Sequence, residues 1–190
     1  MNTELNIQPR HTGGTPPSLY LGDLTNQYQS GMLSSGHLTL RATSNFYLQT
    51  GGTNYRIRAL SDGKFGIGGS GDPKTTFQVE EYGIDTESTT LNNDTQTAIH
   101  TIDKTDFRSS RFTVQVTNTT DSTYMITEIL MIHDGTTPSI TEYGTIFTGS
   151  AREATFDCDI SGDNVRLLAT APSSNTDSLT FKVVSHSITV

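Results

Sequence analysis

The chain has little of the cysteine on which disulfides and thiol chemistry depend, and few of the apolar residues that build a large hydrophobic core. Its 190 residues include one cysteine and no tryptophan, and its hydrophobic fraction is 32%. A single cysteine excludes a disulfide within the chain. Charged residues make up only 17%. This low charge does not fit intrinsic disorder, because disordered chains usually carry more charge and fewer β-branched residues.

Clusters of positive charge and long apolar runs are also missing. The net charge is −8 and the acids are spread along the chain. Phosphate binding needs grouped Lys and Arg, so we expect no nucleic-acid partner. No apolar run approaches the length that crosses a bilayer, so no membrane insertion is expected. Residues 1–10 lack the apolar region of a signal peptide, which predicts assembly in the cytoplasm.

What the chain does contain is short alternating runs bounded by turn residues. Threonine, serine, asparagine and glycine replace the missing apolar residues. Threonine is common on the solvent side of β-strands. No window rich in Ala, Leu, Glu and Lys repeats with the 3.6-residue period of a helix. The sequence therefore predicts an all-β protein.

The most apolar stretch is 123–147, which reads TYMITEILMIHDGTTPSITEYGTIF. It contains two strand-like runs around His133, Asp134, Gly135 and Thr136. Asp-Gly readily takes the positive φ angles of a tight hairpin. We predict a β-hairpin here and expect it to form the core of the C-terminal half.

Residues 96–190 have the regular spacing of a β-sandwich or jelly roll. Strands are expected at 97–102, 111–118, 124–133, 139–147, 153–160, 164–169 and 179–189. Alternation predicts these inward-facing side chains: Phe112, Val114, Val116, Phe156, Cys158, Ile160, Val165, Leu167, Phe181 and Val183. Val184 and Ile188 continue the last strand in the opposite phase, so a β-bulge is expected near Val184 and Ser185.

The preceding residues divide into three predicted segments. Residues 1–18 end in a Gly-Gly-Thr-Pro-Pro run and are expected to form an extended docking arm. Residues 19–80 contain very short strands and few large apolar side chains, so they are expected to associate with identical chains. Residues 81–95 are rich in Thr, Asn and acids and are expected to form a linker.

Several residue groups could be read as sites, and each has a structural alternative. Cys158 could be a nucleophile, but no base is placed beside it by a motif, so a buried small hydrophobe is favoured. His133 beside Asp134 could bind a metal, but a turn residue bonded to backbone is favoured. Asp157, Asp159 and Asp163 could form a calcium site, but a solvated strand face is favoured.

The glycines at 66–69 and the seven tyrosines carry equally weak signals. The glycine run is followed by Pro73 and a strand-like run, whereas a phosphate loop needs a following helix. The tyrosines, with no tryptophan, are expected to pack and not to form a carbohydrate platform. The sequence therefore assigns no catalytic, cofactor-binding or metal-binding residue.

One local pattern carries a family resemblance. Residues 62–68 read D-G-K-F-G-I-G, Asp72 and Pro73 follow, and residues 77–79 read F-Q-V. This resembles the G-x-x-G-I-G … P … L-x-V pattern common in bacteriophage tail fibres and related virion appendages. The resemblance implies a homotrimeric β-structured shaft, with the pattern at the junction between the shaft and the next domain. Phe77 stands where leucine is usual, and 68–71 is an atypical spacer.

The C-terminal half looks like a domain of cyanophage and marine-phage virion structural proteins. The residues that carry this resemblance are 129–135, 141–149, 154–160 and 164–169. Together the two resemblances imply a non-enzymatic virion structural protein: a homotrimeric tail fibre, tail-tip or baseplate-associated appendage, assembled in the host cytoplasm. The implied partners are further copies of the chain, other virion proteins through the arm at 1–18, and host surface glycan.

Two other functions stay open at the level of sequence. A capsid decoration (cement) protein would use the same trimeric knob on the shell of the head. A glycan-binding receptor-recognition module would act at the host surface, and a depolymerase of this kind would release sugars, which we do not expect here.

Overall fold

The structure is a computed structural model that describes residues 29–32, 38–41, 44–50, 54–173 and 175–190. The chain divides between Phe46 and Tyr47 into two units. In the first unit, β1 (Gln29–Met32) pairs antiparallel with β2 (Leu38–Arg41). The predicted arm at 1–18 lies outside the described residues.

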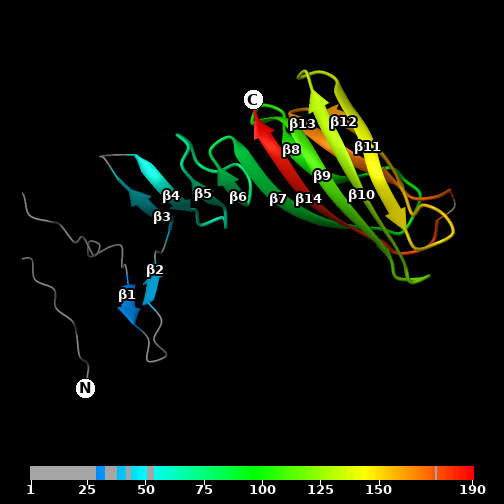
Figure 1. Cartoon of the computed structure of the whole chain (residues 1–190), viewed down its shortest axis with the longest axis horizontal. Coiled ribbons are helices and arrows are strands. Elements are labelled where there is room, and N and C mark those ends of the chain that lie inside the picture. Colours follow the sequence, from blue (N-terminus) through cyan, green and yellow to red (C-terminus); the bar gives the residue numbers. More distant parts are fainter. Residues whose placement is uncertain (1–28, 33–37, 42–43, 51–53, 174) are drawn as a thin grey trace, which may run out of the picture. The chain divides into compact units, whose positions relative to one another are not determined.

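The second unit contains a nine-stranded sheet and a three-stranded sheet (Figure 1). The order in the large sheet is β11-β10-β9-β14-β7-β6-β5-β4-β3. Its strands, in chain order, are β3 (Phe46–Gln49), β4 (Tyr55–Ala59), β5 (Phe65–Ile67), β6 (Phe77–Val79), β7 (Tyr82–Leu91), β9 (Phe107–Asn118), β10 (Thr123–His133), β11 (Pro138–Phe147) and β14 (Leu179–Thr189). The small sheet, in the order β12-β13-β8, consists of β8 (Thr97–Asp103), β12 (Thr155–Ser161) and β13 (Asn164–Thr170).

The hydrophobic core lies between the small sheet and one face of strands β7, β9, β10 and β14. The predicted inward residues Phe112, Val114, Val116, Val165, Leu167, Phe181 and Val183 are buried in it. Phe156, Cys158 and Ile160 of β12 are half-buried against it. The prediction of an all-β chain is confirmed: the described residues form strands and no helix. No helix among them could therefore span a membrane.

Residues 44–50 and 54–90 contain no buried large hydrophobic side chain. Arg58 of β4 and Thr75 of the connection before β6 are buried instead, and the four residues of β3 are all exposed. The low apolar content of the sequence thus leaves strands β3 to β6 outside the core. Backbone pairing attaches these strands to the sandwich, because β6 pairs antiparallel with β7.

The segment at 81–95 differs from the predicted linker. Tyr82–Leu91 is strand β7, which pairs with β14 along its whole length and with β6 at its start. The Thr, Ser and Glu side chains that suggested a linker face solvent at several positions, while the backbone hydrogen bonds on both sides hold the strand. A polar strand of this kind is hard to distinguish from a loop by composition alone.

The predicted bulge near Val184 is also wrong. β14 pairs without interruption with β7 from Leu179 to Ile188, so its alternation does not change phase. Ser185 and Ser187 take the inward positions and are fully buried, while Val184 and Ile188 point outward. The shift in pairing with β9 lies between Ile188 and Thr189 instead.

The predicted hairpin at 123–147 is confirmed as β10 and β11, with the turn at Gly135 in the positive-φ region. It does not form the centre of the C-terminal half. β11 is the edge strand of the large sheet, and β9 and β14 lie further inside it. Only one face of β10 enters the core, through Met125, Ile129 and Met131.

Candidate functional site

The outer face of the sandwich is the face of β7, β14, β9, β10 and β11 that points away from the small sheet. On β10 the alternate residues Ile126, Leu130 and Ile132 lie on this face and are 42%, 45% and 56% exposed. Their immediate neighbours Ile129 and Met131 are buried in the core. Both faces of this strand are therefore apolar, a pattern that belongs to strands covered on both sides.

A groove of about 640 Å³ lies at one end of this outer face. Register places its rows side by side: Ser139, Ile132, Ser109, Ile188 and Tyr82 are neighbours across five strands. The next row contains Thr141, Leu130, Arg111 and His186. Exposed aliphatic side chains in the groove therefore lie among hydroxyl and basic groups.

Several polar side chains of the outer face are paired with one another. Arg111 donates to Glu128, with Nη2 and Oε1 2.8 Å apart. Hydrogen bonding to Tyr143, then to Arg111, lowers the pKa of Glu128, and the same carboxylate raises the pKa of Tyr143. The Tyr82 hydroxyl contacts Nδ1 of His186. None of these groups is placed with a second acid as a hydrolytic pair.

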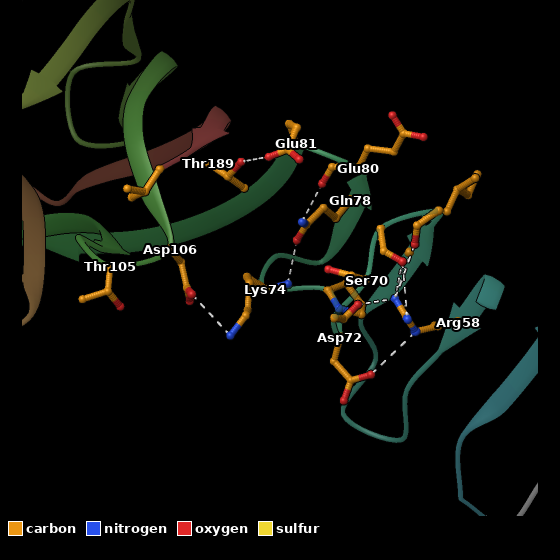
Figure 2. A pocket seen from close by; sticks show the side chains of 17 residues that line it. Arg58, Ser70, Asp72, Lys74, Gln78, Glu80, Glu81, Thr105, Asp106 and Thr189 are labelled. Carbon is orange, nitrogen blue, oxygen red and sulfur yellow. Dashed lines mark hydrogen bonds and ion pairs between the residues drawn. The ribbon is translucent and has the colours of Figure 1, made fainter. Parts of the chain in front are cut away.

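A second hollow, of about 250 Å³, lies beside the glycine-rich loop at 68–72 (Figure 2). Most of its charged side chains also have partners: Arg58, Asp72, Lys74, Glu81 and Asp106. Lys74 Nζ is 3.3 Å from the Asp106 carboxylate, which ties the loop to the start of β9. The backbone N–H of Lys74 donates to Gln78 Oε1 at 2.8 Å. Figure 2 shows these contacts bridging the short strands and the sandwich.

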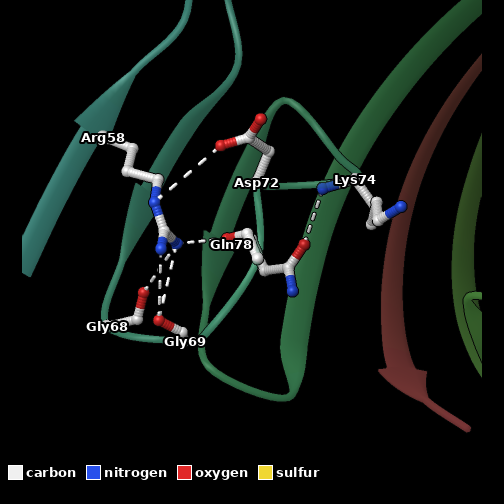
Figure 3. A network of polar contacts seen from close by, with 7 residues as sticks. Arg58, Gly68, Gly69, Asp72, Lys74 and Gln78 are labelled. Atoms are coloured by element: carbon white, nitrogen blue, oxygen red, sulfur yellow. Dashed lines mark hydrogen bonds and ion pairs between the residues drawn. The ribbon is translucent and has the colours of Figure 1, made fainter. Parts of the chain in front are cut away.

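Arg58 organises this loop, as Figure 3 shows. Its side chain is 4% exposed and donates to the carbonyl of Gly68 at 3.3 Å, to that of Gly69 and to that of Gly71. Its Nε lies 3.8 Å from Asp72, and its guanidinium lies over the Tyr55 ring, 4.5 Å from the centroid. The loop thus encloses a cation that the chain itself supplies.

This geometry is the reverse of a phosphate loop, in which backbone N–H groups face an anion. The loop turns its carbonyl oxygens inward, and Gly68 and Gly69 both have a φ of +69°. Those left-handed conformations explain the paired glycines, because other residues adopt them at a cost. Alternation along 55–59 puts Arg58 and Tyr55 on opposite faces of β4, and nothing in that pattern reveals that Arg58 is buried.

The other residues considered from sequence are held apart. Asp159 pairs with Arg166, whose Nε is 2.7 Å from Oδ1, and this hydrogen bond lowers the pKa of Asp159. Asp163 lies 3.3 Å from Lys104, and Asp157 accepts from the Cys158 N–H at 2.8 Å. The three acids do not converge on one point. Within the described ranges, no three His, Cys, Asp or Glu side chains are grouped as metal ligands.

His133 and Cys158 both lie in structural positions. His133 is buried, with Nε2 2.7 Å from the Phe107 carbonyl and Nδ1 accepting from the Gly135 N–H at 3.1 Å. Hydrogen bonds from Thr136 and Thr137 lower the pKa of the adjacent Asp134 to about 2. Cys158 is half-buried, and burial raises the pKa of its thiol, with Asp157 and Asp159 adding to the shift.

His100 is a further buried polar group that the sequence pattern does not predict. His100 on β8 is 2% exposed, and neither of its ring nitrogens makes a hydrogen bond. Its Nδ1 lies 3.2 Å from the Glu87 carboxylate, and its ring contacts Phe112 edge-on. Burial lowers the pKa of His100. Its only signal in the sequence is its place between Ile99 and Ile102, two core residues.

Comparisons with known proteins give a similarity of structure and none of sequence. No protein-family model matches the chain, and no curated protein matches it. The tailspike of Acinetobacter baumannii phage AM24 is similar with a TM-score of 0.41 at 6% identity, over 60% of this chain and 30% of the tailspike.

Two further phage proteins are similar. The Acinetobacter phage vB_ApiP_P1 tailspike has a TM-score of 0.32 at 18% identity, over 54% of this chain and 21% of that protein. Tailspike gp49 of A. baumannii bacteriophage Fri1 has a TM-score of 0.34 at 18% identity, over 57% of this chain and 18% of that protein. This chain spans less than a third of each, and TM-scores below 0.5 do not establish a common fold. The resemblance to cyanophage and marine-phage proteins stays a prediction.

The comparison corrects the prediction that the chain is not an enzyme. The Fri1 protein is described as a capsular polysaccharide depolymerase, which is an enzyme. The prediction rested on the missing catalytic motif. Carboxylates that cleave glycosidic bonds come together from separate strands, roughly 5–10 Å apart, so no local spacing marks them. A β-rich sequence without a motif is therefore no ground for excluding catalysis.

Proposed function

We propose that the chain is a module of a phage tail appendage and acts there as a homotrimer. The observation that carries this proposal is the junction formed by β4, β5 and β6. The residues that resemble the tail-fibre pattern build this junction: Phe65–Ile67 is β5, Phe77–Val79 is β6, and Pro73 lies in the connection between them. The pattern implies a junction between a shaft and the next domain.

The construction of the junction supports that role. β5 pairs parallel with β6 and antiparallel with β4, and β6 continues the ladder into β7 of the sandwich. The rings of Phe65 and Phe77 stack with their centroids 5.8 Å apart. Arg58 ties the connecting loop to β4. A short-stranded segment without a hydrophobic core is thereby coupled to a well-packed domain.

The missing core of this segment supports self-association. Strands β3 to β6 bury no large hydrophobic side chain within the chain, and Phe46, Tyr47, Leu48, Ile67 and Val79 are 36–47% exposed. Segments with so little core usually gain stability through association. The threefold order is taken from the tail-fibre resemblance.

The proposed partners are those of an appendage. Residues 1–18 would dock the chain to other virion proteins, and the sandwich would face the host surface, where glycan is the proposed contact. The location would be the virion.

Immunogold labelling of the particles tests this proposal. Antibodies against the purified chain are expected to label tails. Labelling of heads at high copy number would contradict the proposal and favour a capsid decoration protein. Incubation of the purified chain with host capsular polysaccharide, followed by an assay for new reducing ends, tests whether the module also cleaves its glycan.

A further inference from the structure

The outer face of the sandwich resembles one half of a protein interface. Its large apolar side chains are 37–68% exposed: Tyr82, Tyr124, Ile126, Leu130, Ile132, Tyr143, Ile146, Val184 and Ile188. Together they expose on the order of 800 Å², which is what each partner of a standard-size interface buries. Exposed patches of this size on a folded domain commonly mark binding surfaces.

The charge of this face favours a partner of the same sequence. The chain carries a net charge of −8. By register, the charged residues on the outer face are Arg111, Glu128 and Lys182, and the first two form an ion pair. The face therefore does not share the negative charge of the whole chain. Two copies can approach through it without the repulsion that their other surfaces impose.

The shape of the face provides both halves of a contact. The groove lies at the end that carries Ile132, Ile188 and Tyr82. At the other end, Ile126 and Ile146 are neighbours across β10 and β11, and Ile146 is 68% exposed, so they form an apolar ridge. A contact that joins different parts of one face on successive copies closes into a ring when the rotation allows it.

We infer that the outer face is the surface through which copies of this chain associate, with the ridge of one copy seated in the groove of the next. This inference rests on the proposed homotrimer and names its surface within the sandwich. Glycan is a poorer fit for this groove, because its exposed apolar side chains are Leu130, Ile132 and Ile188 with a single tyrosine, Tyr82, and sugars pack best on aromatic rings.

Sedimentation of the full chain tests the surface. The double variant Ile132→Ser, Ile188→Ser is expected to weaken association roughly a hundredfold or more, since core positions of an interface dominate its affinity. Val190→Ser is the matched control, because Val190 is also exposed, at 63%, but follows the end of β14 and belongs neither to the outer face nor to strands β3 to β6. It is expected to leave association through the outer face within a few-fold of the wild type.

Each result of the sedimentation experiment has one meaning. If the wild type assembles and the double variant assembles equally well, this surface is wrong, while the homotrimer stands. If the wild type is monomeric at every concentration, the homotrimer falls and the surface falls with it.

A cross-linking experiment avoids the question of whether the double variant folds. In a Cys158→Ser background, Ser139→Cys places a thiol in the groove, because Ser139 is the β11 neighbour of Ile132. Ile146→Cys in the same chain places a second thiol on the ridge, roughly 20 Å away along β11, which is too far for a short bis-maleimide to bridge within one copy. The reagent is expected to join the groove thiol of one copy to the ridge thiol of the next. Ser161→Cys, at the end of β12 on the small sheet, combined with Ile146→Cys, is the control that should not cross-link. An assembled chain that gives no cross-link between the groove and the ridge positions would overturn the inference.

Discussion

The two faces of strand β10 have nearly the same composition and opposite environments. Ile129 and Met131 are 0% and 3% exposed under the small sheet, while Leu130 and Ile132 are 45% and 56% exposed on the outer face. The sheet therefore carries two apolar surfaces, and only one is covered within the described residues. One copy of the chain therefore buries only one of the two apolar faces of this strand.

The same contrast runs along β14. Phe181 and Val183 fill the core, and Ser185 and Ser187 continue the inward positions near the end of the strand. The Ser187 hydroxyl is 2.6 Å from that of Ser110, so the buried end of the strand is polar and satisfied. Val184 and Ile188 lie on the outer face. At this end of β14 the larger apolar side chains thus lie on the exposed face, where they contribute little to the stability of a single copy.

The largest expected loss of stability comes from removing a large side chain from the core, beneath the covered face of the sheet. Phe112→Ala should lower the free energy of unfolding by about 3–5 kcal/mol, because Phe112 is buried at the centre of the core. Urea unfolding followed by circular dichroism measures this loss.

Ile132→Ala is the matched change on the other face. It should cost less than about 1 kcal/mol in the dissociated chain, since the side chain is half-exposed there. The comparison between the faces fails if both variants cost the same in dilute protein.

The next effect concerns the junction. Arg58→Met should destabilise strands β5 and β6 by about 1.5–3 kcal/mol, because it removes charged hydrogen bonds to the carbonyls of Gly68, Gly69 and Gly71. Hydrogen exchange of the β5 and β6 amides measures it. Arg56→Met, beside it on β4 and bonded to Thr50, is the control and should change exchange little. Equal effects at the two positions would mean that the loop does not depend on Arg58.

A smaller effect is expected from pH. Burial lowers the pKa of His100 below its unfolded value, so the unfolded chain takes up a proton first as the pH falls. Stability is therefore full above about pH 6.5, the ordinary pKa of histidine, and declines below it. The groups that face His100 are Glu87 and Asp85 of β7 and the Phe112 ring of β9.

His100→Leu should remove this decline, which unfolding midpoints between pH 7.5 and pH 5.5 would measure. Burial also raises the pKa of Glu87. The folded chain therefore takes up a proton at Glu87 more readily than the unfolded chain, and this uptake stabilises the fold as the pH falls. A midpoint that changes with pH in His100→Leu as it does in the wild type would contradict the prediction for His100.

The smallest effect is expected at the acids of β12. Asp159→Asn removes a partly exposed pair with Arg166 and should cost at most about 1 kcal/mol. Because Asp157, Asp159 and Asp163 have separate partners, millimolar calcium should not raise the melting temperature. A clear rise with calcium that Asp159→Asn abolishes would show that these acids do converge.

Sequence reasoning predicted the sandwich well where strands alternate between a buried and a polar face. Phe112, Val114 and Val116 on β9 are such a case, and β14 was located with its ends at 179 and 189. It failed where the two faces of a strand do not differ in polarity in the usual way. β7 is polar on both faces over most of its length, so its composition predicts a linker. At the end of β14 the larger side chains face outward, so alternation predicts a bulge there.

The candidate sites were predictable to a lesser degree. The run from Ile129 to Ile132 signals a strand with two apolar faces, so the outer face could have been expected from it. Nothing in the spacing of Arg58 and the glycines ten or more positions later reveals that their carbonyls enclose it. That contact depends on how three short strands pair, and pairing between separate segments cannot be deduced from local composition.

Footprinting with a photoactivated carbene tests most directly whether the second apolar face of β10 is covered by another copy. In the assembled full chain, Leu130, Ile132 and Ile188 should be protected almost as well as Ile129, and dilution to the dissociated chain should restore their labelling. Strong labelling of these three side chains in an assembled chain, equal to that after dilution, would contradict the account.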